Sequence, residues 1–406
     1  MMRKHVLVTY FYLLAGSFIV SAQTTATVRA QLLPLLTAAQ QAIAANQMPA
    51  ALAKLNEARS IATLNPQETL LIQRLTVAAG INDDAQQALV TASLEGLINS
   101  SLVPLDEKLT LIETAISLSQ KQRNYPLVIQ SVEQYLKLAP AKRSVLVARA
   151  QAHYFLKQFE LAAAQIKTIV EPPKPNEATP EETLLRMWAD SYKQLKNNAG
   201  YESALWLLLK HHPQPAYFAD FLSRKLEGLE PKSRYELDVY RLMRETKSLT
   251  DAEDYLAMVQ LCIKAGLPQE ALDTLQAGKT AGKLSTTTNL AQTNALQSQI
   301  NKRVAEDANS LVKLENEAKI AADGNAAAQA GELYFATAQW AKATSMYESA
   351  ISKGGLRREE MIRLHHAIAL QQSGKLVQAK AAFAWSTFDD TAKMIGQTWL
   401  LLSTKP

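Results

Sequence analysis

The sequence predicts an all-α protein built as a solenoid, in which helix pairs stack on one another instead of surrounding a single deep core. Of the 406 residues 48% are apolar, which excludes general disorder. Only 14 residues are glycine and 15 are proline, and no stretch alternates Val, Ile or Thr with polar residues as a strand does. The third observation is a spacing of small and aromatic residues that recurs along the chain.

The clearest instance of this spacing lies in residues 325–354. Tyr334 follows Gly331 after three residues, and Tyr347 and Ala350 follow Ala343 after four and seven. Small residues at Gly331 and Ala343 allow two helices to cross at close range, and the tyrosines fill the space between neighbouring units. One such unit cannot bury its own apolar face, so we expect the rest of the chain to supply neighbours.

The same spacing identifies further units. Tyr125 and Phe159 are 34 residues apart, and so are Val128 and Ala162. The two gaps from Ala204 to Ala271 and from Ala271 to Ala343 each equal about two repeat lengths, so they predict hidden helix pairs in 217–249 and 289–322. Matches to the spacing, some with insertions, centre on Ala204, Ala271, Ala379 and Phe383, with weaker ones at Ala51 and Ala88.

These motifs resemble those of the tetratricopeptide-repeat (TPR) family, and the chain is similar to its secreted or periplasmic bacterial members. The resemblance covers most of the chain after residue 22. It implies a right-handed α-α superhelix of about ten helix-turn-helix units, several of them degenerate. It also implies a protein-binding scaffold, because such a superhelix exposes the first helix of each unit along a concave groove where a peptide or a partner helix can lie.

The groove positions of the two best-spaced units carry polar side chains. They are Glu113, Ser117 and Gln120 in one unit, and Gln151 and Tyr154 in the next. The best-known members of the family hold a peptide's C-terminal carboxylate with paired lysines and asparagines. These positions carry no such clamp, so the sequence favours a polar groove lined by Gln and Tyr over a receptor of that kind.

Two stretches break the helical pattern. Residues 171–182 contain four prolines, and we expect the next helix to start with Thr179 as its cap and Pro180 in its first turn. Residues 277–289 hold two glycines and a Ser/Thr run, which predict a loop. The predicted subarrays are therefore 23–170, 183–276 and 290–406, the last ending in a helix whose Trp399 marks either a cap or a docking surface.

The N-terminal segment 1–22 has the pattern of a secretory signal peptide. Arg3 and Lys4 precede an apolar run, and the small residues at its end predict cleavage between Ala22 and Gln23. An uncleaved anchor is the alternative, although the apolar run is shorter than the roughly 20 residues that a spanning helix needs. After cleavage we expect no membrane span and a periplasmic or secreted chain.

Charge and reactive residues limit the chemistry. Removal of Arg3 and Lys4 lowers the formal charge from +5 to +3, and basic residues are scattered among acids, so no nucleic-acid partner is predicted. The single cysteine, Cys262, excludes an internal disulfide and lies in an apolar run, as a small buried hydrophobe would. The pairs His211–His212 and His365–His366 point about 100° apart on a helix, so neither pair converges on a metal. The sequence predicts no catalytic residue, no cofactor and no metal site.

These observations predict a non-enzymatic adaptor of the bacterial cell envelope, with a peptide or protein partner in the concave groove. Two alternatives stay open. A helical-toroid hydrolase or lyase that acts on cell-wall glycan would need a pair of carboxylates facing one cavity. A purely structural, self-associating array would form higher assemblies in solution.

Overall fold

A computed structural model of the chain describes residues 28–171, 179–230, 233–285 and 287–403. The predicted signal segment and its cleavage site lie outside these residues. The described residues form 21 helices and no strand, which confirms the all-α solenoid. None of these helices is long and apolar enough to cross a membrane. The chain divides into two compact units, Met1–Tyr201 and Glu202–Pro406, while the division into three subarrays stays a prediction.

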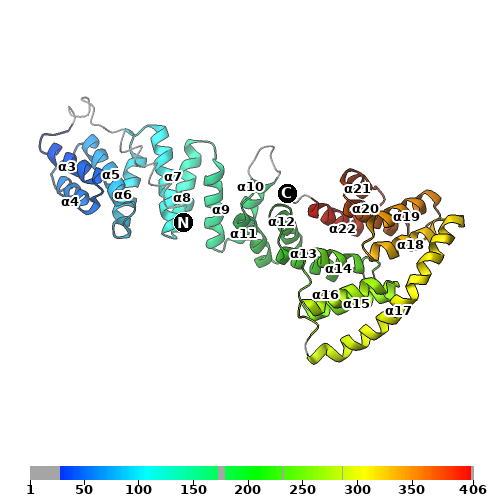
Figure 1. Ribbon diagram of the computed structural model, residues 1–406. Helices are drawn as coiled ribbons and strands as arrows, with labels where there is room; N and C mark the ends of the chain where they lie inside the picture. The colour runs from blue at the N-terminus through cyan, green and yellow to red at the C-terminus, as the bar shows by residue number, and fades with distance from the viewer. Residues whose placement is uncertain (1–27, 172–178, 231–232, 286, 404–406) are drawn as a thin grey trace. The chain divides into compact units, whose positions relative to one another are not determined.

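The N-terminal unit, Met1–Tyr201, is a row of helix pairs (Figure 1). The two helices of each pair pack together, and first helices of successive pairs also touch, as α7 does with α9 and α9 with α11. Successive pairs therefore pack against one another. The helices are α3 (Leu33–Ala44), α4 (Met48–Arg59), α5 (Pro66–Gly80), the 3-10 helix η1 (Asp84–Gln86), α6 (Gln87–Asn99), α7 (Leu105–Lys121), α8 (Tyr125–Leu138), α9 (Arg143–Phe155), α10 (Phe159–Val170) and α11 (Glu182–Gln194); α12 (Asn198–His211) crosses the boundary between the units.

The turns within these pairs place one residue in the left-handed region. Asn46, Arg123 and Lys157 have φ angles of 57°, 57° and 60°, and each lies two residues after its first helix ends. A left-handed residue ends a helix and reverses the chain within a few residues. Because non-glycine residues adopt this conformation only where the surroundings require it, the packing of the two helices determines the turn.

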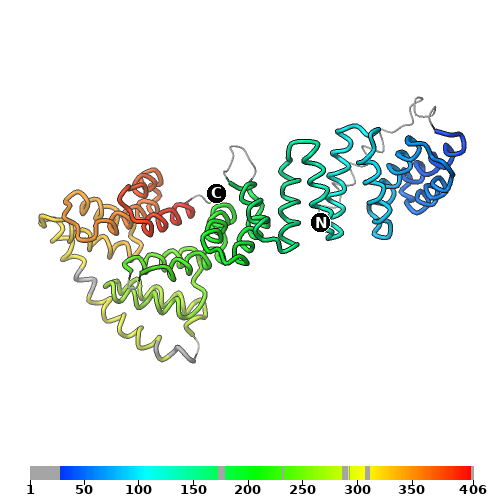
Figure 2. Tube along the Cα trace, turned by 180° about the vertical axis from the view of Figure 1, so that it is seen from behind, coloured from blue at the N-terminus to red at the C-terminus, as the bar shows by residue number. Residues whose placement is uncertain are grey.

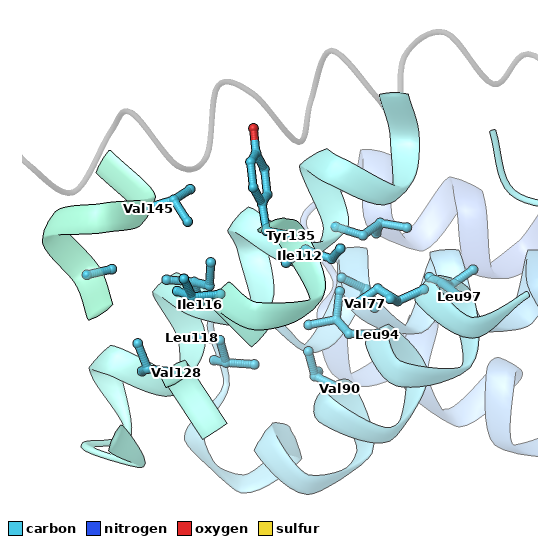
Figure 3. Close-up of a cluster of buried hydrophobic side chains, with 14 of the residues drawn as sticks. Val77, Val90, Leu94, Leu97, Ile112, Ile116, Leu118, Val128, Tyr135 and Val145 are labelled. Atoms are coloured by element: carbon cyan, nitrogen blue, oxygen red, sulfur yellow. The ribbon is translucent and has the colours of Figure 1, made fainter. Parts of the chain in front are cut away.

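The core of the N-terminal unit extends across consecutive pairs (Figure 3). Val77 of α5 and Leu94 of α6 lie in one cluster with Ile112 and Leu118 of α7 and Tyr135 of α8. Each of these five side chains exposes 6% or less of its surface. Burial of one such side chain contributes roughly 1.5–3 kcal/mol. Since the cluster spans neighbouring pairs, no single pair carries enough apolar contact to be stable alone.

The C-terminal unit, Glu202–Pro406, also consists of helix pairs, in the order shown by the tube in Figure 2. The hidden pair predicted in 217–249 is confirmed, because two helices, α13 and α14, occupy that segment and pack together. The helices are α13 (Pro215–Glu227), α14 (Glu236–Glu245), α15 (Ala252–Ala265), α16 (Pro268–Thr280), α17 (Thr287–Ile320), α18 (Asn325–Ala336), α19 (Trp340–Lys353), α20 (Glu359–Gln372), α21 (Leu376–Phe383) and α22 (Asp390–Leu402).

The prediction of a second hidden pair in 289–322 is wrong. Residues 289–320 belong to α17, a single helix of 34 residues. The chain has no glycine or proline between Gly282 and Gly324, so nothing in this segment favours a turn. α17 packs on α16 and on α18, and so connects two neighbouring pairs as one long helix.

The helix that follows the first predicted break begins later than expected. α11 begins at Glu182 with the extended residue Glu181 before it, so Thr179 is not the cap. Arg143 of α9 donates to the carboxylate of Glu181 (3.0 Å) and holds the chain in place there. Residues 172–178 lie outside the described part of the chain.

The second predicted break is shorter than expected. Residues 277–280 belong to the last turn of α16, and α17 starts at Thr287. Gly278 lies inside this last turn, where a Cβ would come within 2.6 Å of the Leu284 side chain. The glycine therefore allows a close approach, and Gly282, with φ of 73°, is the one that ends the helix.

Residues that mark the sequence repeat lie where helices meet. Gly331 faces the ring of Tyr347, and a Cβ on the glycine would come within 2.6 Å of that ring. Tyr334 donates to Glu315 of α17, while the Tyr347 ring lies 6.5 Å from the ring of His365 on α20. Tyr125 and Phe159 are partly buried. Fully or almost fully buried are Ala162, Ala204, Ala271, Ala343, Ala350, Ala379 and Phe383.

The last helix, α22, is a cap. It packs on α20, α21 and α14, and Trp399 exposes only 4% of its surface. Gln371 of α20 donates its amide to the backbone carbonyl of Trp399 (2.7 Å). The apolar side of α22 that the sequence left open to either interpretation is therefore turned inward.

Candidate functional site

The sequence-predicted binding residues lie on two consecutive first helices of the N-terminal unit. Glu113, Ser117 and Gln120 have the i, i+4, i+7 spacing that places them on one side of α7. Gln151 and Tyr154 have the equivalent spacing on α9. All five are half-buried, so they line a surface without being sealed in the core. We refer to these five residues as the first-helix face.

Side chains of the first-helix face bond sideways to the neighbouring first helix. Gln120 Nε2 donates to Gln151 Oε1 (3.2 Å), which joins α7 to α9. Tyr154 donates its hydroxyl to Asp190 of α11 (2.8 Å). Burial and the Asp190 carboxylate raise the pKa of Tyr154 to about 12, so the hydroxyl stays a neutral donor. The structure thus brings Gln120 of α7 next to Gln151 of α9, and Tyr154 with its partner Asp190 extends this polar row to a third helix, α11.

The Gln120–Gln151 bond leaves hydrogen-bonding capacity on each side chain. It uses one amide group and one carbonyl group, so within the described part of the chain the carbonyl oxygen of Gln120 and the amide of Gln151 have no other partner. One acceptor and one donor are the groups that a peptide bond can pair with. Ser117 lies one turn away from Gln120 and donates to the backbone carbonyl of Glu113 (3.0 Å), which leaves its oxygen as an acceptor.

Ion pairs between consecutive first helices flank this row. Lys142, at the start of α9, pairs with Glu113 (2.5 Å), and Arg74 of α5 pairs with Glu107 of α7 (2.7 Å). Pairs this exposed contribute at most about 1 kcal/mol each, so their main effect is to fix the spacing of the helices. Lys142 thereby compensates the negative charge of Glu113, and the other four residues of the first-helix face present neutral polar groups to a ligand.

A cavity of about 180 Å³ opens on the other side of this unit, between α6, α7 and α8. Glu95 and Asn99 of α6 face Gln130 and Gln134 of α8, above a floor that includes Leu118. The sequence does not predict this cavity, because the second-helix positions of the repeat carry no motif. Its size suits one side chain of a partner, not a cofactor.

The C-terminal unit contains a buried charge cluster, which we define as Asp238 and Arg241 of α14, Glu270 of α16, Glu332 of α18 and His365 of α20. Arg241 binds Glu270 (2.7 Å) and Asp238 (2.8 Å). His365 bonds Asp238 through Nε2 (2.8 Å) and Glu332 through Nδ1 (2.6 Å). The side chains of Asp238, Arg241, Glu270 and His365 expose only 1–3% of their surface.

Opposite charges keep the cluster ionised despite its burial. Burial by itself would lower the pKa of His365, but the carboxylates of Asp238 and Glu332 outweigh it and raise the pKa to about 10. Burial would likewise raise the pKa of each carboxyl group, yet His365 holds the pKa values of Asp238 and Glu332 below their usual range, and Arg241 does the same for Glu270. At neutral pH all five groups are charged.

The charge cluster does not supply what the glycan-cleaving alternative requires. A glycosidase needs a carboxylic acid that is protonated at working pH and reaches its substrate. The carboxylates of Asp238 and Glu270 are buried and have lowered pKa values. They therefore serve as charge partners for Arg241 and His365.

The sequence contained little signal for the charge cluster. In the sequence His365 stands out only as half of a histidine pair, and its partner Asp238 is 127 residues away. Among the described residues no group of three His, Cys, Asp or Glu side chains is arranged to hold a metal. Cys262 is confirmed as a buried hydrophobe, and burial raises the pKa of its thiol further above neutral pH.

Comparisons with known proteins give only distant likenesses. No protein-family model and no curated protein matches the sequence. One similar solved structure is a Rap protein complexed with competence and sporulation factor: it is 13% identical, covers 91% of this chain and 99% of its own, and has a TM-score of 0.27. Another is the TPR domain of P58(IPK), which is 14% identical, covers 85% of this chain and 99% of its own, and has a TM-score of 0.21. Both TM-scores are low, so nothing about function is inferred from either structure.

Proposed function

We propose that the chain is a non-enzymatic interaction scaffold that binds an extended peptide or a segment of a partner protein along the first-helix face. The observation that carries this proposal is the Gln120–Gln151 pair, which joins two consecutive first helices and still offers one acceptor and one donor. Peptide main chains present the complementary groups at every residue. Ser117 and Tyr154 extend the polar row on either side, so the partner is held largely through its backbone.

The charges of the face support a partner that is close to neutral where it makes contact. Glu113 is already paired with Lys142, and Asp190 already accepts from Tyr154. A charged peptide group competes with Lys142 or Asp190 for its partner, whereas a neutral polar segment leaves both bonds intact.

The proposed location is the bacterial cell envelope, in the periplasm or outside the cell. It rests on the N-terminal segment 1–22, whose charged start, apolar run and small residues favour cleavage between Ala22 and Gln23. N-terminal sequencing of the chain isolated from its natural host is expected to read Gln23 first. A chain that starts at Met1 would contradict cleavage.

Site-specific crosslinking tests the binding face. A photoreactive residue at Ser117 is expected to capture a partner polypeptide, and Gln151→Ala is expected to reduce its yield. The matched control places the same photoreactive residue at Glu133, which is exposed on the second helix α8. Equal capture at both positions, or capture at Ser117 that Gln151→Ala leaves unchanged, would overturn the proposal.

A further inference from the structure

Helix α14 lies where an array of helical repeats ordinarily takes up a ligand, against a row of first helices. α18 and α20 are the first helices of their pairs and touch each other, and α22 packs next to α20. α14 packs on α22, and its Asp238 reaches His365 of α20 (2.8 Å). The Arg241 guanidinium lies 4.9 Å from the ring centre of Phe335 on α18. Figure 1 shows α14 beside the α20–α22 end of this row.

Ion pairs hold α14 near both of its ends. Arg234, just before the helix, pairs with Glu360 of α20 and with Asp389, the cap of α22 (3.3 Å). Arg244, in the last turn, joins Arg241 on the carboxylate of Glu270 (3.0 Å). The contacts therefore extend along the whole helix.

The helix depends for its existence on its neighbours, which are α13 and α15 as well as α22. α14 has 10 residues, and isolated helices this short are not stable in water. Its Val239, Leu242 and Met243 expose 1% of their surface or less, so the surrounding helices cover its apolar side completely. In both respects α14 behaves like an amphipathic peptide that folds on a binding surface.

We propose that the row α18, α20 and α22, together with Glu270 of α16, is a helix-binding site, and that α14 is its internal ligand, which keeps the site closed to a partner helix until α14 is released. The class of ligand follows from the occupant: an amphipathic helix with an acidic residue and an arginine three positions apart, as in Asp238 and Arg241. This inference concerns the C-terminal unit alone and does not depend on the first-helix face.

The charges of the site make it selective for such a helix. Glu270 of α16 and His365 of α20 bond to side chains of α14, and Glu332 of α18 bonds to His365. An apolar helix in the same place would leave the buried Glu270 without Arg241 and Arg244 and would remove the Asp238 carboxylate from His365, which is unfavourable. A helix with an acid and an arginine in the positions of Asp238 and Arg241 satisfies His365 and Glu270 together.

Hydrogen exchange on the full chain tests whether α14 leaves the site as a unit. In Asp238→Asn, which loses the charge facing His365, amide exchange in residues 236–245 is expected to become at least tenfold faster, while α15, α16 and α19 change less than twofold. The matched control is Glu68→Gln, which removes a buried, arginine-paired carboxylate from the N-terminal unit. Equal acceleration from α13 to α22, or no acceleration in α14, would overturn the proposal.

A peptide of residues 233–247 tests the site in the other direction. The fluorescein-labelled peptide is expected to bind saturably to the Asp238→Asn protein and at least tenfold more weakly to the unaltered chain, whose site is filled. The same peptide with Arg241→Glu is the control and is expected not to bind. Equal binding of the 233–247 peptide to both proteins, or binding to neither, contradicts an internal ligand.

A milder substitution keeps the test valid if Asp238→Asn does not fold. Arg244 is 35% exposed and shares Glu270 with Arg241, so Arg244→Ala weakens one contact of α14 and leaves the others. Exchange in residues 236–245 is expected to rise about threefold, with the rest of the C-terminal unit unchanged. A uniform rise across this unit would again identify α14 as ordinary core.

Discussion

The two units treat the polar side chains of their first helices in different ways. In the N-terminal unit Gln120, Gln151 and Tyr154 bond sideways and stay half-buried. In the C-terminal unit the corresponding side of α18 and α20 carries Glu332 and His365, which pair with each other, and His365 also contacts Asp238 and Arg241 of α14. The difference shows that the polar side chains of first helices stay half-buried in one unit, whereas in the other unit a helix of the same chain, α14, covers them.

The largest expected effect separates the buried ion pairs from the half-exposed ones. Arg241→Ala leaves Asp238 and Glu270 buried without their main cation, and we expect it to destabilise the C-terminal unit by about 3–5 kcal/mol. The control is Arg74→Ala, whose pair with Glu107 in the N-terminal unit is partly exposed and should cost about 1 kcal/mol or less. Segment-resolved hydrogen exchange in urea measures both. Similar losses in the two units would contradict the comparison.

The second prediction concerns pH. Folded His365 holds its proton up to about pH 10, whereas the unfolded residue releases it near pH 6.5, so its stabilisation is complete below pH 6.5 and is lost as the pH rises towards 10. Between pH 6.5 and 8.5 the C-terminal unit is expected to lose about 2 kcal/mol of unfolding free energy. Urea unfolding at a series of pH values measures the slope, and His365→Gln should abolish it.

The N-terminal unit should respond at the opposite end of the pH scale. Hydrogen bonds from Arg29 lower the pKa of the buried Glu68 to about 2, so its stabilisation is present above pH 4.5 and is lost as the pH falls towards 2. The same unfolding series should therefore show acid sensitivity in the N-terminal unit without the alkaline slope. An alkaline slope of equal size in both units would show that His365 is not its source.

The third prediction tests the close helix crossing that the repeat pattern requires. Gly331→Leu places side-chain atoms where even a Cβ comes within 2.6 Å of Tyr347, and we expect a loss of about 1–3 kcal/mol and a lower melting temperature. The control is Ala338→Gly, seven residues on in the turn, where φ is 55° and glycine relieves strain. An unchanged melt for Gly331→Leu would mean that α18 and α19 do not cross at this glycine.

The smallest expected effect lies on the first-helix face. Tyr154→Phe removes the hydrogen bond to Asp190 while keeping the ring, and should cost about 0.5–1 kcal/mol in the N-terminal unit. In the crosslinking experiment it should reduce capture at Ser117 much less than Gln151→Ala does, because Gln151 carries the free donor. A larger loss of capture from Tyr154→Phe would move the centre of the site towards α11.

Much of the fold could be predicted from the sequence because the spacing of small residues that marks each helix pair is a local pattern. Small residues such as Ala162 and Ala343, spaced by the repeat length, mark helix crossings, and they are fully buried in the structure. The helix pair in 217–249 followed from the same spacing. α17 did not, because a segment without glycine or proline satisfies the repeat length equally well as two helices or as one.

The candidate sites divide in the same way. By itself the sequence determined that the chain is an array of helices and that Gln151 and Tyr154 lie on one side of a helix, since helical periodicity relates residues a few positions apart. Only the tertiary structure decided which first-helix surfaces are covered. Asp238 and His365 meet across 127 residues, and no local pattern encodes a contact that exists only after α14 has packed on α20.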